Sequence, residues 1–223
     1  MSRDDGKRLV AVWDLPTRAC HWLAVALIAA AYATVRLGWM DWHARVGDAL
    51  LAVLLFRVAW GIFGGETARF SRFLTPPRLA ARHLAHLFRR EPDTELGHNP
   101  AGAWMVIALL ALMLGQTLSG LYVGNDIADE GPLTEIVSAP LANLIEAAHD
   151  RFLWDALPAA IALHIAAILV HAAIKRQDLV RPMFTGRKRL PLGARPPAFA
   201  SATRAATVLA GSLAAATAII RFL

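Results

Sequence analysis

The segment HDRFLWDALPAAIALHIAAILVHAAIK, residues 149–175, decides the fold class. Its part from about 154 to 174 is almost wholly apolar, and roughly 20 apolar residues in a helix cross the hydrocarbon core of a bilayer. Three histidines nevertheless lie in it: His149, His164 and His171. Polar side chains inside a membrane usually face the protein interior and have a partner there. The segment therefore predicts a transmembrane helix that contributes to a functional site.

Similar segments lie on either side of it. Those at about 20–39, 43–63 and 101–123 precede it, and a shorter Ala-rich one at about 205–220 follows. The 223-residue chain is 57% hydrophobic and only 18% charged, with a mean hydropathy of +0.45, which is too apolar for a soluble domain. We predict an all-α integral membrane protein. It is a four-helix bundle with a fifth, C-terminal transmembrane helix, and its fourth helix begins near Pro140.

Two further segments complete the predicted organisation. PPRLAARHLAHLFRR, residues 76–90, has apolar residues at helical spacing flanked by arginines, which predicts a helix lying on the cytoplasmic membrane surface. Residues 176–201 are basic and punctuated by Pro and Gly, and we interpret them as a linker. Residues 1–189 then form a four-helix transmembrane domain, and residues 190–223 form a linker and the C-terminal transmembrane helix.

The charged residues predict the orientation in the membrane. Lys and Arg gather before the first span, between the second and third, and after the fourth, whereas the connection between the third and fourth spans carries Asp126, Asp129 and Glu130. By the positive-inside rule, this is a multi-pass protein of the bacterial cytoplasmic (inner) membrane with a cytoplasmic N-terminus. The basic residues behind the formal net charge of +6 then determine the topology and contact anionic lipids of the bilayer. We therefore expect no nucleic-acid partner.

Several site types are excluded by residue content. The single cysteine, Cys20, rules out a disulfide framework and a cysteine-based zinc or iron–sulfur site. The chain contains no C-x-x-C-H motif, so a covalently attached c-type haem is excluded too. The acidic residues Asp4, Asp5 and Asp14 before the first span argue against a cleaved signal peptide.

With this topology, each histidine has a depth in the bilayer. His43 and His149 lie at the periplasmic ends of the second and fourth helices. His21 lies at the cytoplasmic end of the first helix, where either His164 or His171 can face it, and simple depth matching favours His171. Since His149 and His164 are 15 residues apart, or about 22 Å along a helix, the chain can hold two stacked pairs of histidines.

Two facing histidines without an added carboxylate or thiol suit a b-type haem, which is held without covalent links. A structural zinc ion fits less well, because it requires four ligands. Iron with two axial histidines passes electrons and does not readily bind oxygen. Two such irons about 20 Å apart would carry electrons across the bilayer. The alternative of a haem-free membrane anchor leaves four depth-matched histidines without a role.

Arginines near these depths are candidate cofactor-binding residues. Arg57 lies inside the second span, 14 residues past His43, and a lone intramembrane arginine needs an anionic partner. It meets either a propionate of the cytoplasmic haem or, by snorkelling, the inner membrane surface. Arg36, Arg45 and Arg151 lie near the periplasmic edge and are candidates to bind the other haem.

Four stretches of the chain resemble the bacterial cytochrome b561 family, which includes the cytochrome b subunit of nickel–iron hydrogenases. They occur in the family order and together span roughly residues 11–189. They are VWDLPTRACHWL (12–23), HARVGDALLAVLLFRVAWGIFG (43–64), LGHNPAGAWMVIALLALMLGQTLSGLY (96–122) and EAAHDRFLWDALPAAIALHIAAILVHAAIKRQDLVRPMFTGRK (146–188). The resemblance implies that residues 1–189 are a four-helix domain holding two non-covalent b haems.

The resemblance also implies two ligand pairs, His21 with His164 on the cytoplasmic side and His43 with His149 on the periplasmic side. The stretch ALHIAAILVH favours His164 over His171, because the family ligand is the first of its two histidines. The family usually separates its two fourth-helix ligands by 14 residues, whereas here they are 15 apart with Pro158 between them. We therefore expect a bulge or kink in this helix.

A chain of this kind is expected to transfer electrons between the quinone pool and a partner redox protein, such as a hydrogenase or a periplasmic cytochrome c. The acidic connection after the third span suits a basic cytochrome. The alternative is a superoxide:ubiquinone oxidoreductase acting alone, as some relatives are, although an acidic connection repels an anionic substrate. A homodimer is compatible with either reading.

Overall fold

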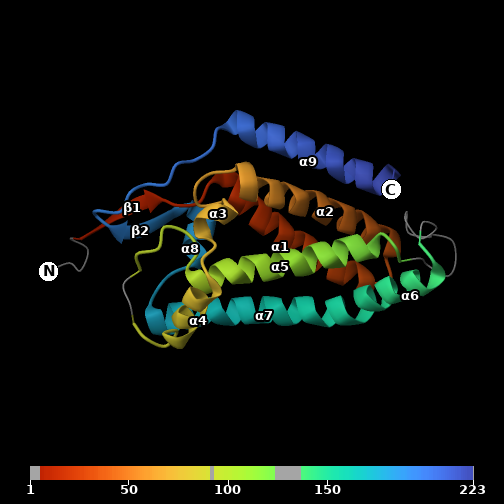
Figure 1. Ribbon diagram of the computed structural model, residues 1–223, viewed down its shortest axis with the longest axis horizontal. Coiled ribbons are helices and arrows are strands. Elements are labelled where there is room, and N and C mark those ends of the chain that lie inside the picture. Colours follow the sequence, from red (N-terminus) through yellow and green to blue (C-terminus); the bar gives the residue numbers. More distant parts are fainter. Residues whose placement is uncertain (1–5, 91–92, 124–136, 223) are drawn as a thin grey trace. The chain divides into compact units, whose positions relative to one another are not determined.

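A computed structural model describes residues 6–90, 93–123 and 137–222 of the chain. Of these described residues 71% are helical, and they include five helical segments long and apolar enough to cross a membrane (Figure 1). The all-α membrane fold predicted from the sequence is thereby confirmed. These segments are α1 (Leu15–Arg36), α2 (Met40–Phe63), α5 (Pro100–Gly120), a continuous fourth segment (Ala139–Lys175) and α9 (Ala202–Phe222).

The fourth segment changes its helical type along its length. It consists of α6 (Ala139–Ala147), a π-helical turn η2 (Ala148–Leu153), α7 (Trp154–Val170) and a second π-helical turn η3 (His171–Lys175). A π-turn takes in an extra residue and is most often found at functional sites. The bulge expected from the 15-residue histidine spacing is therefore present, and α7 continues through Pro158 without ending.

The apolar side chains of the long helices lie largely on their outer surfaces. On α7, Leu163, Ile165 and Leu169 are 61%, 50% and 62% exposed. In water such a contiguous apolar surface would be costly, whereas in a bilayer it meets lipid chains. The exposure pattern therefore agrees with a membrane-embedded bundle.

The chain divides into two compact units, and each long helix contributes a part to both. Unit 1 contains residues 1–19, 59–107 and 162–206, and unit 2 contains residues 20–58, 108–161 and 207–223. In unit 2, Leu51 of α2 and the buried Leu121 form a core against which Leu55, Leu114, Tyr122 and two residues of α9, Ile219 and Ile220, pack. The C-terminal helix is thus part of the packed structure of unit 2.

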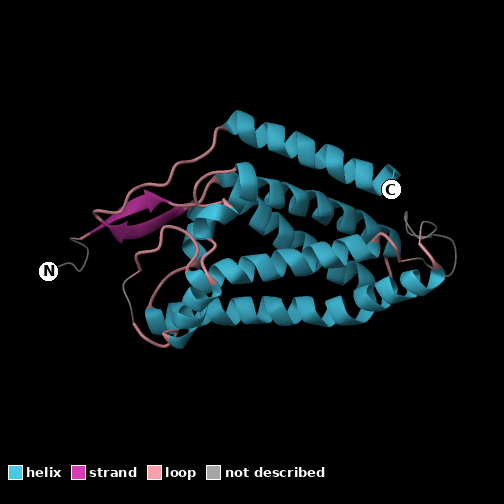
Figure 2. Cartoon of the chain, in the orientation of Figure 1, coloured by secondary structure: helices cyan, strands magenta, loops and turns pink. Residues whose placement is uncertain are grey.

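Unit 1 contains a two-stranded antiparallel sheet that the sequence did not suggest. Strand β1 (Lys7–Ala11) pairs with β2 (Arg187–Pro191), with Leu9 opposite Arg189 (Figure 2). Val10, Val12 and Leu190 are buried together. The interpretation of residues 176–201 as a linker was therefore wrong in part, since this stretch holds β2 and a short helix, α8 (Val180–Thr185).

Asp14 fixes the start of α1 in unit 1. Its Oδ1 atom accepts a hydrogen bond of 2.9 Å from the backbone N–H of Thr17, as a helix-capping carboxylate does. Its Oδ2 atom accepts one of 3.1 Å from the indole N–H of Trp60 on α2. One buried carboxylate therefore defines both the first turn of α1 and the position of the α2 end.

The surface helix expected over 76–90 is present but shorter. It is α4 (Pro77–Ala85), preceded by the single turn α3 (Phe70–Phe73). The apolar residues Leu79, Leu84 and Phe88 are 39%, 55% and 70% exposed, as expected for a helix that contacts lipid along one face. The side of the membrane on which it lies remains a prediction.

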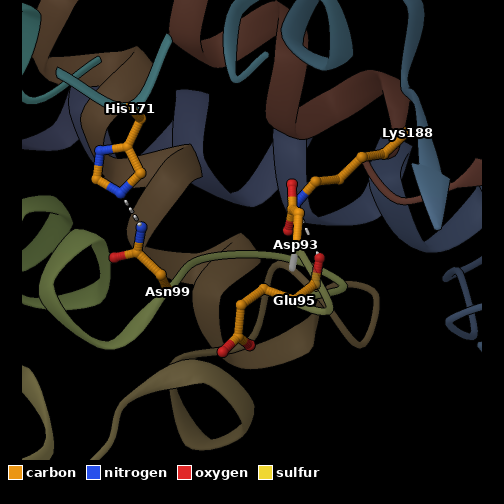
Figure 3. Close-up of polar contacts among 5 residues, drawn as sticks. All are labelled: Asp93, Glu95, Asn99, His171 and Lys188. Carbon is orange, nitrogen blue, oxygen red and sulfur yellow. Dashed lines mark hydrogen bonds and ion pairs between the residues drawn. The ribbon is translucent and has the colours of Figure 1, made fainter. Parts of the chain in front are cut away.

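A buried ion pair connects β2 to the segment before α5. Lys188, 8% exposed, donates to the carboxylate of Asp93 (2.7 Å) and to the carbonyl oxygen of Glu95 (2.9 Å) (Figure 3). Burial raises the pKa of the Glu95 carboxyl, and the nearby Lys188 partly opposes this. The contacts hold residues 93–95 against the sheet and so position the segment that leads into α5.

Candidate functional site

Two of the predicted ligands, His43 and His149, face one another in unit 2. His43 lies in the first turn of α2 and His149 in the π-turn η2. Their ring centres are 6.4 Å apart, and the ring planes meet at 80°. Two metal–imidazole bonds of about 2.0–2.1 Å on opposite sides of one ion put the ring centres roughly 6 Å apart. The separation therefore fits two axial ligands of one metal ion.

Hydrogen bonds define the proton position on His149. The Ser119 hydroxyl donates to the carbonyl oxygen of Gln116 (3.1 Å), so its oxygen is left to accept from Nδ1–H of His149 (3.0 Å). Nε2 then carries the lone pair and accepts from the Gln116 amide at 3.2 Å. Neutral imidazole with a free Nε2 lone pair is the form that binds metal, and a hydrogen-bonded Nδ1–H is the usual support.

His43 has the same proton arrangement. Its Nδ1 lies 3.1 Å from the carbonyl oxygen of Ala31 in α1. A carbonyl oxygen can only accept, so Nδ1 carries the proton and Nε2 the lone pair. Both rings are therefore held through Nδ1, with Nε2 as the nitrogen that can coordinate a metal.

Gly120 at the end of α5 makes room for the His149 ring. A Cβ atom at this position would lie 2.9 Å from Cε1 of His149, which is too close without displacing the ring. A Cβ on Gly115 would meet Leu153 at an ordinary 3.5 Å. Of these two α5 glycines, only Gly120 is required by the His149 ring.

His171, the alternative to His164, is a buried and fully hydrogen-bonded residue of unit 1. It is 4% exposed, and Nδ1 donates to the carbonyl oxygen of Ala167 (2.8 Å). Nε2 accepts from the Asn99 side-chain amide at 3.3 Å (Figure 3). The ring also stacks on His83 of α4, with centres 5.9 Å apart and planes 13° apart. Face-to-face rings do not direct both nitrogens at one ion between them.

The second predicted pair is divided between the two units. His21 belongs to unit 2, where its ring lies edge-on to Trp22 at 4.9 Å. His164 belongs to unit 1 and is half-buried in α7. Their pairing stays a prediction.

The predicted arginines have different environments. Arg57 is 8% exposed within α2, so its side chain is covered by protein rather than extended toward water. Arg36 lies over the ring of Tyr32 (5.8 Å), and Arg45 lies over Trp42 (5.2 Å), and both arginines are exposed. Arg151 is exposed in η2. Their binding to a haem propionate stays a prediction.

Among the described residues, no group of three or more His, Cys, Asp and Glu side chains could hold a metal ion. A pair of histidines is therefore the largest protein donor set found at this site. Such a pair suits a metal whose other ligands come from its own macrocycle, as in haem. The donor set and the ring separation of His43 and His149 both fit haem b.

Sequence reasoning missed three residues that hold the histidines: Gln116, Ser119 and Asn99. Gln116 and Ser119 are polar residues in the otherwise apolar run of α5, and polar residues in a membrane usually have a partner. That signal could have drawn attention to them. Asn99 precedes Pro100 at the start of α5, where its Oδ1 accepts from the N–H of Gly102 (2.7 Å), as a helix cap does.

Comparisons with known proteins agree with these observations. A family model described as prokaryotic cytochrome b561 matches residues 12–186, which include all four predicted histidine ligands. No curated protein and no solved structure matches the chain. The family and the five apolar helices make this a multi-pass bacterial membrane protein. The chain belongs to the prokaryotic cytochrome b561 family, whose members are membrane electron-transfer proteins that bind haem b.

Proposed function

We propose that the protein is a di-haem cytochrome b that transfers electrons across the bilayer between the quinone pool and a partner redox protein. The observation that carries the proposal is the pair His43 and His149, whose ring centres are 6.4 Å apart. Both rings are held through Nδ1–H. This pair would hold one haem b, which when bound supplies a reversible one-electron iron couple.

The residues around this pair would set its properties. Ser119 accepts from Nδ1–H of His149, which raises the basicity of Nε2 and orients the ring. Gln116 donates to Nε2, the nitrogen that would bind iron, so this amide would have to release Nε2 for the metal. With two neutral imidazoles as its protein ligands, a bound haem would be suited to electron transfer rather than to oxygen binding.

His21 and His164 would hold the second haem, as the resemblance implies. Two features of His171 support this choice: its amide partner Asn99 also caps α5, and its ring stacks nearly parallel on His83. Arg57 is covered by protein and would neutralise a propionate of this haem, because a buried guanidinium needs an anionic partner. Arg36 and Arg45 would do the same for the first haem at its exposed edge.

Quinone is the proposed membrane-soluble substrate, and a basic cytochrome c or a hydrogenase is the proposed protein partner. Glu146 and Asp150 are exposed beside the His149 turn, and acidic residues there favour a basic partner over an anionic substrate. This charge pattern is the reason to rank electron transfer to a partner above oxidation of superoxide. The remaining acidic residues of that connection, Asp126, Asp129, Glu130 and Glu135, lie outside the described residues.

The test is a reduced-minus-oxidised spectrum with a haem count on the purified protein. We expect the α-band of b haem and two haems per chain, and His43→Ala should reduce the count to one. A protein with no b-type spectrum contradicts the proposal. Stopped-flow reduction of the holoprotein by quinol, by superoxide and by reduced cytochrome c then separates the partner-dependent reading from the self-sufficient one.

A further inference from the structure

A hollow on the surface of unit 1 is lined by none of the proposed haem ligands. It has a volume of about 320 Å³ and is lined by Leu9 of β1, Arg181 and Thr185 of α8, and Arg187 of β2. Its lining thus includes two cationic residues and one residue with a hydroxyl group. The hollow therefore has the chemistry of an anion site with one apolar wall.

The two arginines are available for an external anion. Among the described residues, no carboxylate forms an ion pair with Arg181 or Arg187. The nearest acidic residue along the chain, Asp178, has its Oδ1 atom occupied by the backbone N–H groups of Val180 and Arg181, at 3.1 and 3.0 Å. Two cations that line one hollow and have no carboxylate partner among the described residues favour binding of a negatively charged group.

The backbone around the hollow is held in place before any ligand binds. The carbonyl oxygen of Gly186 accepts from the N–H groups of Val12 (2.8 Å) and Trp13 (3.1 Å). Gly186 has a φ of 75°, and a Cβ there would lie 2.8 Å from the Trp13 carbonyl oxygen. The Thr185 hydroxyl donates to the Arg181 carbonyl oxygen (3.0 Å) and accepts from Arg187 N–H (3.2 Å). A preformed site loses less free energy on binding.

The surroundings of the hollow indicate what kind of anion it takes. α8 begins at Val180, five residues after Lys175 ends the fourth membrane-spanning segment. Val180, Phe184 and Leu9 are 45%, 59% and 56% exposed. Leu9 lines the hollow, and Val180 and Phe184 belong to α8, the helix that supplies Arg181 and Thr185. A ligand with a phosphate head and hydrocarbon chains satisfies both features, whereas a free phosphate uses only the cations.

We propose that this hollow binds the phosphodiester head group of an anionic phospholipid. Arg181 and Arg187 hold the phosphate, and Val180, Phe184 and Leu9 contact the acyl chains. The site is independent of the haem ligands, so its occupancy can be measured whatever the proposed electron-transfer partners are.

The experiment compares the wild-type holoprotein with R181Q/R187Q in detergent. Lipid retention by native mass spectrometry and thermal unfolding are measured with added phosphatidylglycerol, phosphatidylcholine or inorganic phosphate. We expect wild type to retain phosphatidylglycerol preferentially and to be stabilised by it. The double variant should bind it roughly 30-fold more weakly, since each arginine near a lipid surface contributes a factor of about five.

The matched control is R78Q/R204Q, which removes the same charge from two exposed arginines outside the hollow. It should retain phosphatidylglycerol as wild type does. An equal loss in this control shows a general charge effect and overturns the proposal. Equal stabilisation by phosphatidylcholine, or by inorganic phosphate alone, overturns it as well. Because lipid preference is first measured on the wild-type protein, a misfolded variant does not decide the outcome.

Discussion

Two histidines of the fourth helical segment each accept a hydrogen bond from a side-chain amide, one within α5 and one just before its first residue. The two amides differ in how firmly they are fixed. Asn99, which donates to His171, also caps α5 through its Oδ1 atom. Gln116 donates to His149, but its own Oε1 atom is buried without a hydrogen-bond partner. Moving Asn99 breaks a helix cap, whereas moving Gln116 breaks only its contacts with His149. This difference distinguishes His171, which has a structural role, from His149, which can exchange its amide partner for a metal.

The aromatic rings that lie beside these two histidines also distinguish them. His171 and His83 stack nearly parallel, while His149 and His43 meet at 80° with centres 6.4 Å apart. Only the second arrangement fits two nitrogens directed at a shared ion. Polarity and helix position alone would rank His149 and His171 alike. Their surroundings distinguish them.

Replacing each histidine gives the largest expected effect. His149→Ala should remove one haem per chain, because it deletes a proposed axial ligand. His171→Ala should keep the haem count and lower the free energy of unfolding by about 1–3 kcal/mol, because it leaves a buried amide and carbonyl unsatisfied. The haem content of the purified variants and their urea unfolding test both. Loss of a haem in His171→Ala with full content in His149→Ala would reverse the comparison.

Replacing the amide side chains of Asn99 and Gln116 should have the next largest effects. Asn99→Ala should destabilise the fold by about 1–2 kcal/mol through loss of the α5 cap, with the haem potentials nearly unchanged. Gln116→Leu should leave the free energy of unfolding nearly unchanged and shift the midpoint potential of one haem, because it alters the polarity beside Nε2 of His149. Redox titration with chemical denaturation measures both quantities. A potential shift in the Asn99 variant alone would contradict this assignment.

Gly120→Ala probes the space around His149. The new Cβ would lie 2.9 Å from the ring, so we expect weaker haem retention and a changed spectrum at one site. The matched control is Gly211→Ala on α9, where nothing lies within 4 Å of the added atom. That variant should be neutral or up to about 1 kcal/mol more stable, since alanine favours a helix over glycine. Identical behaviour of the two variants would show that His149 does not need this space.

The smallest expected effect on stability comes from a surface contact of Glu66 in unit 1, which involves none of the histidines. The N–H of Ala198, followed by Arg195, lowers the pKa of Glu66 below its ordinary value. Because the folded-state pKa is lowered, the contact stabilises the fold above the ordinary glutamate pKa and is lost as the pH falls through the folded-state value. Glu66→Gln should slightly lower the Tm at neutral pH, and its effect should shrink as the pH falls below the ordinary glutamate pKa. An effect that grows on acidification would have the wrong sign.

The spans and the histidine pair at the α2 and η2 turns were predictable because both depend on local patterns. Apolar runs of membrane length predict helices irrespective of packing. The 15-residue spacing from His149 to His164 predicted a bulge, and η2 is that bulge. The sequence predicted one depth for His43 and His149, and in unit 2 their rings lie near each other. The ligand roles themselves remain predictions.

The sheet and the roles of Gln116 and Asn99 could not be predicted, because they depend on contacts between residues far apart in the sequence. Strand β1 has five residues and pairs with a strand near residue 190, so neither strand has a detectable pattern of its own. Gln116 and Asn99 acquire different roles only because η2 and η3 bring different histidines to them. No spacing along α5 contains that information.

The sheet also has a consequence for the order of events during biosynthesis. Ala11 of β1 pairs with Arg187 of β2, and the chain between them contains the first four membrane-spanning segments. At a synthesis rate of about 5–20 residues per second, β1 waits on the order of ten seconds or longer for its partner. Pairing therefore joins the two ends of the four-span region only after its last helix has been made. The sheet closes the domain late, so a truncated chain lacking β2 would leave the edge of β1 exposed to other pairing partners.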